Sequence, residues 1–247
     1  MAGHSKWKQI KHKKAKTDAQ RGKVFTRLIK EITVAARAGG GDEAANPRLR
    51  TAIATAKGAN MPLNNIERAI KKGTGELPGV AYEEMTYEAY GPGGSALLIE
   101  CLTDNKNRTV AEIRHLLSKN KGNLGESGSV AWMFERKGEI TLETGGRSED
   151  DLMEIVLESG AEDIEVDGDA ATITCAPEDL YTVKNNLESL GVAVESAELA
   201  MTPKNTVEVD GANVESVLKL MEVLEEHDDV QNVFSNFDID ESVFDDA

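Results

Sequence analysis

Cationic side chains are concentrated in the first thirty residues of this 247-residue chain. Ten lysines and arginines occur there against a single acid, Asp18, although the whole protein has a formal charge of −16. Closely spaced ammonium and guanidinium groups bind phosphates, so the pattern indicates contact with a polyanion. The ten cations are Lys6, Lys8, Lys11, Lys13, Lys14, Lys16, Arg21, Lys23, Arg27 and Lys30.

Trp7 gives the same stretch a second chemical capability. It stands between Lys6 and Lys8, and an indole flanked by ammonium groups can stack on an unpaired base while its neighbours meet phosphates. The alternative is that Trp7 anchors the segment against the folded protein, and the sequence leaves both open. His4 and His12 belong to the same stretch, where they can donate hydrogen bonds.

Charge is segregated along the whole chain. Residues 1–80 contain 17 Lys and Arg against 6 Asp and Glu, a net charge of +11. Residues 81–135 contain 5 against 8, a net −3, and residues 136–247 contain 6 against 30, a net −24. Such polarity favours nucleic-acid contact through the basic end. The alternative interpretation is that the basic and acidic parts are only charged surfaces exposed to solvent, with no binding partner.

The sequence contains no coherent catalytic or metal-binding set. The phosphate-binding loop pattern does not occur, and the glycines of residues 91–94 lie between two expected strands, where they indicate a hairpin turn. No histidine pairs with another histidine or a cysteine at metal-ligand spacing. Asp163 begins a run that resembles a calcium loop, but Thr174 occupies the twelfth position, which requires glutamate. We therefore expect a binding protein rather than an enzyme, with no catalytic residue, no metal and no cofactor.

Cysteine usage and hydropathy bear on the compartment. Cys101 and Cys175 fall in separate expected strands, which fits reduced thiols in the cytosol better than a disulfide. No apolar run approaches the roughly 20 residues of a membrane helix, and no apolar stretch of a secretory signal follows the basic start. We expect a cytoplasmic protein with no membrane partner. A monomer is expected, because no heptad or exposed apolar stripe stands out.

Periodicity predicts three helices behind the basic segment. Apolar residues recur at helical spacing over residues 18–38, Asn46-Pro47 predicts the start of a second helix, and Pro62 predicts the start of a third, which ends near Gly73. The first helix carries a cationic stripe opposite its apolar side, formed by Lys23, Arg27, Lys30 and Arg37. A cationic stripe is often only a solvated face. Because this one continues the basic segment, we expect both to bind nucleic acid.

The remainder of the chain alternates short strands with helices. Strands are expected at 86–90, 95–102 and 129–134 around one helix, and residues 139–201 follow the β-α-β-β-α-β order of a ferredoxin-like module. The elements near 206–236 are too few to fold alone, so we predict that they return to complete the middle module. The expected domains are a basic arm at 1–17, a helical domain at 18–79, a discontinuous α+β domain at 80–135 plus 205–247, and an inserted α+β domain at 136–204.

Short motifs spread over the chain carry a resemblance to a known family. They include Met1-Ala-Gly-His-Ser-Lys-Trp-Lys8, Asn46-Pro-Arg-Leu-Arg50, Tyr87-Glu-Ala-Tyr-Gly-Pro-Gly-Gly94, Asn105-Lys-Asn-Arg-Thr109 and Gly122-Asn-Leu-Gly125. Together they resemble the YebC/PmpR family, which includes the mitochondrial translational activator of cytochrome c oxidase I. The resemblance implies a multidomain α+β fold. An N-terminal three-helix domain is followed by two ferredoxin-like α+β domains, one inserted in the other.

The resemblance also implies a function. Family members are usually described as cytoplasmic DNA-binding transcriptional regulators, and some as ribosome-associated translation factors that help synthesis through difficult peptide sequences. We therefore expect a non-catalytic nucleic-acid-binding regulator, with DNA as its target or, alternatively, ribosomal RNA and the ribosome. A nuclease or other enzyme is the remaining alternative. The expected binding residues are Lys6, Trp7, Lys8, Lys11, His12, Lys13, Lys14, Lys16, Arg21, Lys23, Arg27, Lys30 and Arg37.

Overall fold

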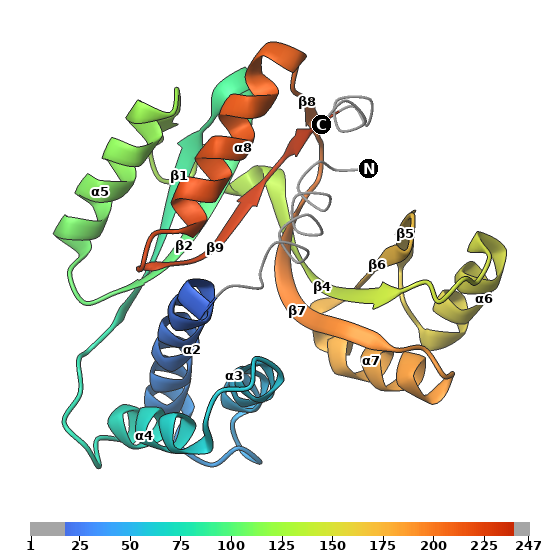
Figure 1. The fold of residues 1–247 in the computed structure, drawn as a ribbon, viewed down its shortest axis with the longest axis horizontal. Helices are drawn as coiled ribbons and strands as arrows, with labels where there is room; N and C mark the ends of the chain where they lie inside the picture. Colours follow the sequence, from blue (N-terminus) through green and yellow to red (C-terminus); the bar gives the residue numbers. More distant parts are fainter. Residues whose placement is uncertain (1–17, 240–247) are drawn as a thin grey trace. The chain divides into compact units, whose positions relative to one another are not determined.

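The computed structural model describes residues 18–239, with side chains from residue 22 onward except at positions 149, 167 and 212. The basic arm at 1–17 therefore lies outside the described residues. Within the described range the chain forms two compact units (Figure 1). The first contains residues 18–130 and 209–233, and the second contains residues 131–208 and 234–239.

Three helices begin the described chain, as the sequence predicts. They are α2 (Asp18–Gly39), α3 (Pro47–Gly58) and α4 (Leu63–Thr74). The side chain of Asn46 caps α3 by accepting a hydrogen bond from the Leu49 N–H at 3.1 Å, and Pro47 occupies the first turn, where its missing N–H costs nothing. The apolar sides of the helices share one core, which includes Ile32, Leu49, Ile53, Met61 and Ile66.

Gly73 lets α2 and α4 pack closely against each other. A Cβ at this position would lie 2.5 Å from the Thr33 carbonyl oxygen and 2.7 Å from the Cβ of Ala36. Both distances are shorter than any van der Waals contact, so a larger residue here would push the two helices apart. The close approach fixes the angular position of α2, and hence the direction of its cationic stripe.

A four-stranded sheet in the order β3-β1-β2-β9 follows the helices. Its strands are β1 (Glu83–Tyr90), β2 (Ala96–Thr103), β3 (Asn123–Leu124) and β9 (Val230–Ser235). The antiparallel strands β1 and β2 are joined by the tight turn at 91–94. Two helices, α5 (Lys106–Lys119) and α8 (Gly211–Glu225), pack beside each other against the sheet (Figure 1). The segment at 211–235 thus completes a sheet that residues 83–124 begin, while the domain boundaries drawn from the sequence stay predictions.

The second unit is built on a sheet in the order β5-β6-β4-β7. Its elements are β4 (Phe134–Glu143), α6 (Glu149–Ser159), β5 (Asp163–Asp167), β6 (Ala170–Cys175), α7 (Leu180–Ser189) and β7 (Val194–Pro203). This is the predicted β-α-β-β-α-β order, with both helices on one face over a core of Ile140, Ile173 and Leu187 (Figure 1). A short parallel pair, β8 (Val207–Glu208) and β10 (Phe237–Asp238), belongs to the same unit.

One strand prediction was wrong. Residues 129–134 do not form a strand, because residues 131–133 make a 3₁₀ turn and a single strand, β4, runs from Phe134 through Glu143. Val130 and Phe134 are buried while Trp132 between them is exposed. Apolar residues four positions apart follow the spacing of a helical turn rather than the alternation of a strand, and a short apolar run does not distinguish the two.

The mixed α+β class expected from the sequence is confirmed, with N-terminal helices followed by two four-stranded sheets and a short two-stranded one. None of the described helices is long and apolar enough to cross a membrane.

Candidate nucleic-acid interface

Nine of the thirteen predicted binding residues lack a described side chain. Eight of them belong to the arm at 1–17, and Arg21 lies in the first turns of α2, ahead of the first described side chain at residue 22. The described residues therefore bear on the cationic stripe of α2 alone, which consists of Lys23, Arg27, Lys30 and Arg37.

The first three cations of the stripe face an acidic segment at the end of α8, residues 225–229 (Glu-Glu-His-Asp-Asp). The Lys23 ammonium donates a hydrogen bond to the Glu226 carbonyl oxygen at 3.4 Å. Arg27 is partly buried, which lowers the pKa of its guanidinium, and the negative charges of Glu225 and Asp228 oppose that shift. Lys23 and Arg27 thus lie beside an acidic part of the same chain about 200 residues away.

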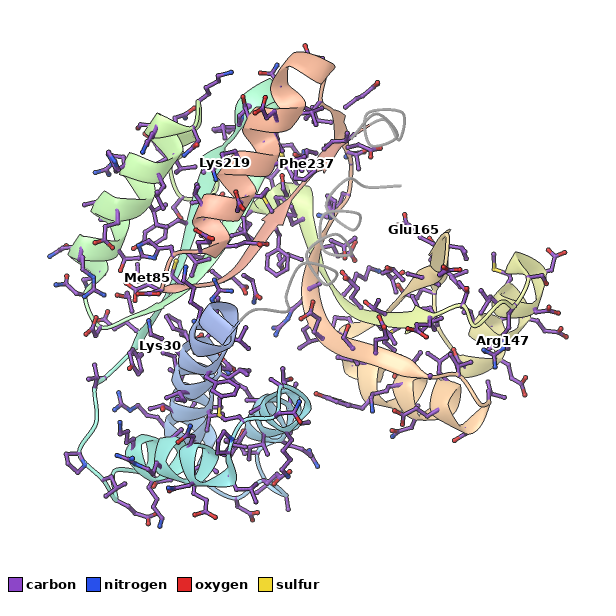
Figure 2. All side chains as sticks on the ribbon, viewed as in Figure 1. Lys30, Met85, Arg147, Glu165, Lys219 and Phe237 are labelled. Atoms are coloured by element: carbon purple, nitrogen blue, oxygen red, sulfur yellow. The ribbon has the colours of Figure 1, made fainter. Side chains whose placement is uncertain are left out.

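Lys30 is buried, with 7% of its surface exposed, and lies near the middle of α2 (Figure 2). Its Nζ donates hydrogen bonds to Asp229 Oδ1 at 2.7 Å, to the Asp228 carbonyl oxygen at 2.9 Å and to the Leu102 carbonyl oxygen at 3.3 Å. The ring centroid of Tyr82 lies 5.6 Å from the same ammonium, within cation–π range. All three ammonium protons therefore have acceptors within the described residues, and Lys30 is buried although it lies on the cationic stripe.

Asp229 is the centre of this buried cluster. Besides Lys30, its carboxylate accepts hydrogen bonds from Arg108 Nη2 at 2.8 Å, Thr109 Oγ1 at 2.7 Å and Thr103 Oγ1 at 3.1 Å. Burial by itself would raise the pKa of the Asp229 carboxyl, but the donors from Lys30, Arg108 and Thr109 outweigh it and hold that pKa well below its ordinary range. The cluster ties α2 to the start of α5 and to the segment before β9.

The same cluster contains the one described group of side chains that could hold a metal ion, formed by Glu112, His227 and Asp229. The Asp229 N–H donates to His227 Nδ1 at 3.1 Å, so the other ring nitrogen carries the proton that is shared with Glu112 at 2.8 Å. Lys30 and Arg108 already occupy the Asp229 carboxylate, and a divalent cation would be repelled by both. The arrangement favours a structural ion-pair cluster over a metal centre.

A different set of cations remains exposed on the helical domain. Arg37 belongs to the stripe, whereas Lys23 of the stripe is exposed but is hydrogen-bonded to the Glu226 carbonyl oxygen. The other members lie on α3 and α4 and are outside the predicted list. The exposed cations are Arg37, Arg50, Lys57, Arg68 and Lys71. Within the described residues none of the five forms an ion pair, whereas Arg48 beside them binds Glu31 at 2.7 Å and Glu84 at 2.6 Å.

A sequence signal for two of these four additional residues exists. Arg50 and Lys57 are seven residues apart, which places both on one side of α3, at the edge of the buried side that contains Leu49 and Ile53. The periodicity predicts that such an edge is accessible, but only the fold shows which of its cations form no ion pair among the described residues.

Comparison with known proteins identifies the family. Residues 5–76 match the N-terminal domain of TACO1/YebC proteins, and residues 82–237 match their second and third domain. A probable transcriptional regulatory protein of Desulfotalea psychrophila is 57% identical over 244 residues, covering 98% of both chains. One of Chlorobaculum tepidum is also 57% identical over 244 residues, covering 98% of this chain and 97% of the relative.

A solved structure agrees with these sequence matches. The crystal structure of a conserved hypothetical protein from Aquifex aeolicus superposes with a TM-score of 0.85 at 53% identity, covering 92% of this chain and 94% of that one. Matches of this length and identity show common descent and a common fold, and the chain belongs to the TACO1/YebC family.

Proposed function

We propose that this chain is a non-catalytic nucleic-acid-binding regulator of gene expression. It binds phosphates through the basic arm at 1–17 and through the exposed cations of the helical domain. The observation that carries the proposal is the set Arg37, Arg50, Lys57, Arg68 and Lys71, which is exposed and lacks ion pairs within the described residues. The helices that carry these cations follow the arm in the sequence. The arm and the helical domain can therefore bind the same polyanion.

DNA is the first candidate target, because several relatives carry the name probable transcriptional regulatory protein. The exposed cations are distributed over three helices, which suits contacts to the phosphate backbone better than reading of base edges. Affinity should therefore depend steeply on salt and weakly on sequence. In this scheme Lys23, Arg27 and Lys30 orient the helical domain, and they do not contact the nucleic acid.

Ribosomal RNA is the second candidate target. Three helices that present separate cations match the irregular phosphate surface of structured RNA as well as they match a duplex. Sedimentation of a cell lysate on a sucrose gradient distinguishes the two candidates. Co-migration with ribosomal subunits supports a translational role, and absence from ribosomal fractions together with enrichment at promoters supports a transcriptional one.

The absence of catalysis is part of the proposal and has its own test. Among the described residues the one group of potential metal ligands is engaged by Lys30 and Arg108, which leaves no open position for a reacting water. Labelled RNA and DNA incubated with the purified protein and Mg²⁺ should remain intact. Cleavage that co-purifies with the protein would contradict the proposal.

A matched pair of variants tests the interface. Arg50→Gln with Lys71→Gln removes two exposed cations from the helical domain, while Arg114→Gln with Lys119→Gln removes two exposed cations from α5. In a gel-shift titration with duplex DNA, the first pair should weaken binding about tenfold at 0.1 M salt and reduce the salt slope by about 1.8, at roughly 0.9 per phosphate contact. The second pair should change neither. Equal effects of both pairs would reveal a response to net charge alone and would contradict the assigned interface.

A further inference from the structure

Both helices of the second unit lie on one face of its sheet (Figure 1). Ile140, Ile164 and Ile173 point to that face, where they pack with apolar residues of α6 and α7. Side chains alternate across a strand, so the residues next to these isoleucines point to the opposite face, which is polar. We call it the acidic face, defined by Glu139, Glu143, Asp163, Glu165 and Glu198.

The strand register places three of these carboxylates in one row across the sheet. Glu139 lies opposite Glu198 in the pairing of β4 with β7, and opposite Thr174 in the pairing of β4 with β6. Thr174 in turn lies opposite Asp163 of β5. Directly opposite side chains have Cβ atoms about 4.5–5.5 Å apart, and like charges at that spacing repel each other. Binding of a cation would relieve this repulsion.

The charge of the acidic face is not offset by the lysine that β4 places there. Lys137 binds Glu162 at 2.8 Å and Glu135 at 3.6 Å instead. Glu143, Asp163 and Glu165 form no ion pair among the described residues. Burial raises the pKa of the Glu165 carboxyl, and the negative charges of Asp163 and Glu139 raise it further. The acidic face is therefore electrostatically suited to a cationic ligand.

A threonine hydroxyl in the same face lacks a hydrogen-bond partner within the described part of the chain. Thr172 of β6 lies opposite Thr141 of β4 and Glu165 of β5, and it is only 8% exposed. Most polar side chains that are this deeply buried have a partner. The hydroxyl can accept a hydrogen bond from a ligand on this face, and the surrounding carboxylates select a cationic donor such as a lysine ammonium.

We propose that the acidic face is the docking site of the basic arm at 1–17 of the same chain. The arm contains six lysines and no acid, so its charge is complementary to that of the face. Seventeen residues can span up to about 60 Å, against about 14 Å between the outer strands of a four-stranded sheet. A tethered segment reaches an effective concentration in the millimolar range, so it occupies the face ahead of a basic segment of another protein.

Docking and nucleic-acid binding compete for the arm, and in this respect the inference rests on the proposed function. The docked state lowers the apparent affinity for nucleic acid in proportion to the fraction of chains whose arm is released. A polyanion with many phosphates can displace the acidic face, whereas an isolated phosphate cannot. The chain therefore rejects small anions and responds to an extended nucleic acid.

Trp7 reports on docking without any nucleic acid, because it belongs to the arm and Trp132→Phe leaves it as the single tryptophan. In the full-length Trp132→Phe chain, docking should protect Trp7 from quenching by acrylamide at low salt, and high salt should remove that protection. Adding Glu143→Gln with Glu165→Gln, the acidic-face pair, should raise the quenching constant at low salt to its high-salt value.

Glu154→Gln with Glu158→Gln on α6 is the matched control pair. It removes two exposed carboxylates from the helical side of the same unit and should leave the quenching of Trp7 unchanged. In a gel-shift titration with duplex DNA, the acidic-face pair should bind about fivefold more tightly than the control pair, because more arms are released. Thr172→Val leaves the charge unchanged and should tighten binding about threefold relative to wild type, since the hydroxyl no longer accepts a lysine ammonium.

The possible outcomes separate this inference from the proposed function. If the two pairs change Trp7 quenching and DNA affinity equally, only net charge matters and the docking site is wrong. Protection of Trp7 that grows with protein concentration would assign the face to the arm of a second chain and overturn docking within one chain. If wild type binds DNA but Trp7 is quenched alike in every variant and at every salt concentration, this inference fails and the proposed function stands. If wild type binds no nucleic acid, the proposed function fails, and protection of Trp7 that the acidic-face pair removes would still support docking.

Discussion

Replacement of Lys30 by methionine tests whether this cation stabilises the fold or binds nucleic acid. The substitution keeps the length of the side chain but removes an ammonium that is hydrogen-bonded to Asp229, to the Asp228 carbonyl oxygen and to the Leu102 carbonyl oxygen. Breaking a buried ion pair by removing one partner costs about 3–5 kcal/mol. Arg108 and two threonines still compensate Asp229, so we expect the lower end, about 3 kcal/mol. For a chain of this size that corresponds to about 6–12 °C in Tm.

Urea denaturation followed by circular dichroism measures this loss. Lys57→Met is the control, because Lys57 is exposed on α3 without an ion pair within the described residues, and its free energy of unfolding should change by less than about 0.5 kcal/mol. At a temperature where both variants are folded, Lys30→Met should bind duplex DNA like wild type. A loss of stability below about 1 kcal/mol, the value for a surface ion pair, would refute the structural role. Weaker DNA binding by folded Lys30→Met than by the wild-type chain would refute it as well.

Three further predictions follow from buried groups. Gly73→Ala should lower the free energy of unfolding by about 1–3 kcal/mol, because the added Cβ meets the Thr33 carbonyl oxygen, and thermal denaturation measures it. Neither cysteine should react with a thiol reagent at pH 8 until urea unfolds the chain, since burial raises the pKa of the Cys101 thiol to about 12 and also raises the pKa of Cys175. Because the pKa of Asp229 is lowered in the folded state, its stabilisation is full above about pH 4 and is lost as the pH falls further. The stability difference between wild type and Asp229→Asn should therefore shrink below about pH 4, and a difference that grows there would contradict the assignment.

Local features of the fold were predictable from the sequence because their causes are local. The Asn46-Pro47 pair caps and starts α3 whatever lies beyond it, and alternating patterns with a tight turn give the β5–β6 hairpin at 163–175. The prediction of a strand at 129–134 was wrong, and the cause is also local. Five apolar residues allow either a strand or a turn, and the burial of Val130 and Phe134 decides between them.

The candidate site was only partly predictable, because its chemistry depends on distant segments. Helical periodicity correctly places Lys23, Arg27 and Lys30 on one stripe of α2. In the folded chain these three cations lie against the acidic segment at 225–229. The sequence around α2 does not indicate a contact with a segment about 200 residues away. The sequence places Arg50 outside the core of α3 and Lys71 in the last turn of α4, but only the folded chain shows that neither forms an ion pair among the described residues.

The salt dependence of nucleic-acid binding tests the central claim most directly. The association constant for duplex DNA should be measured between 50 and 200 mM salt for the wild-type chain and for Lys11, Lys13, Lys14 and Lys16→Ala together. Each phosphate contact contributes about 0.9 to the slope of log K against log salt. We expect a steep slope for wild type that falls by up to about 3.6 in the quadruple variant, with weaker binding. An identical slope and affinity in both proteins would contradict it.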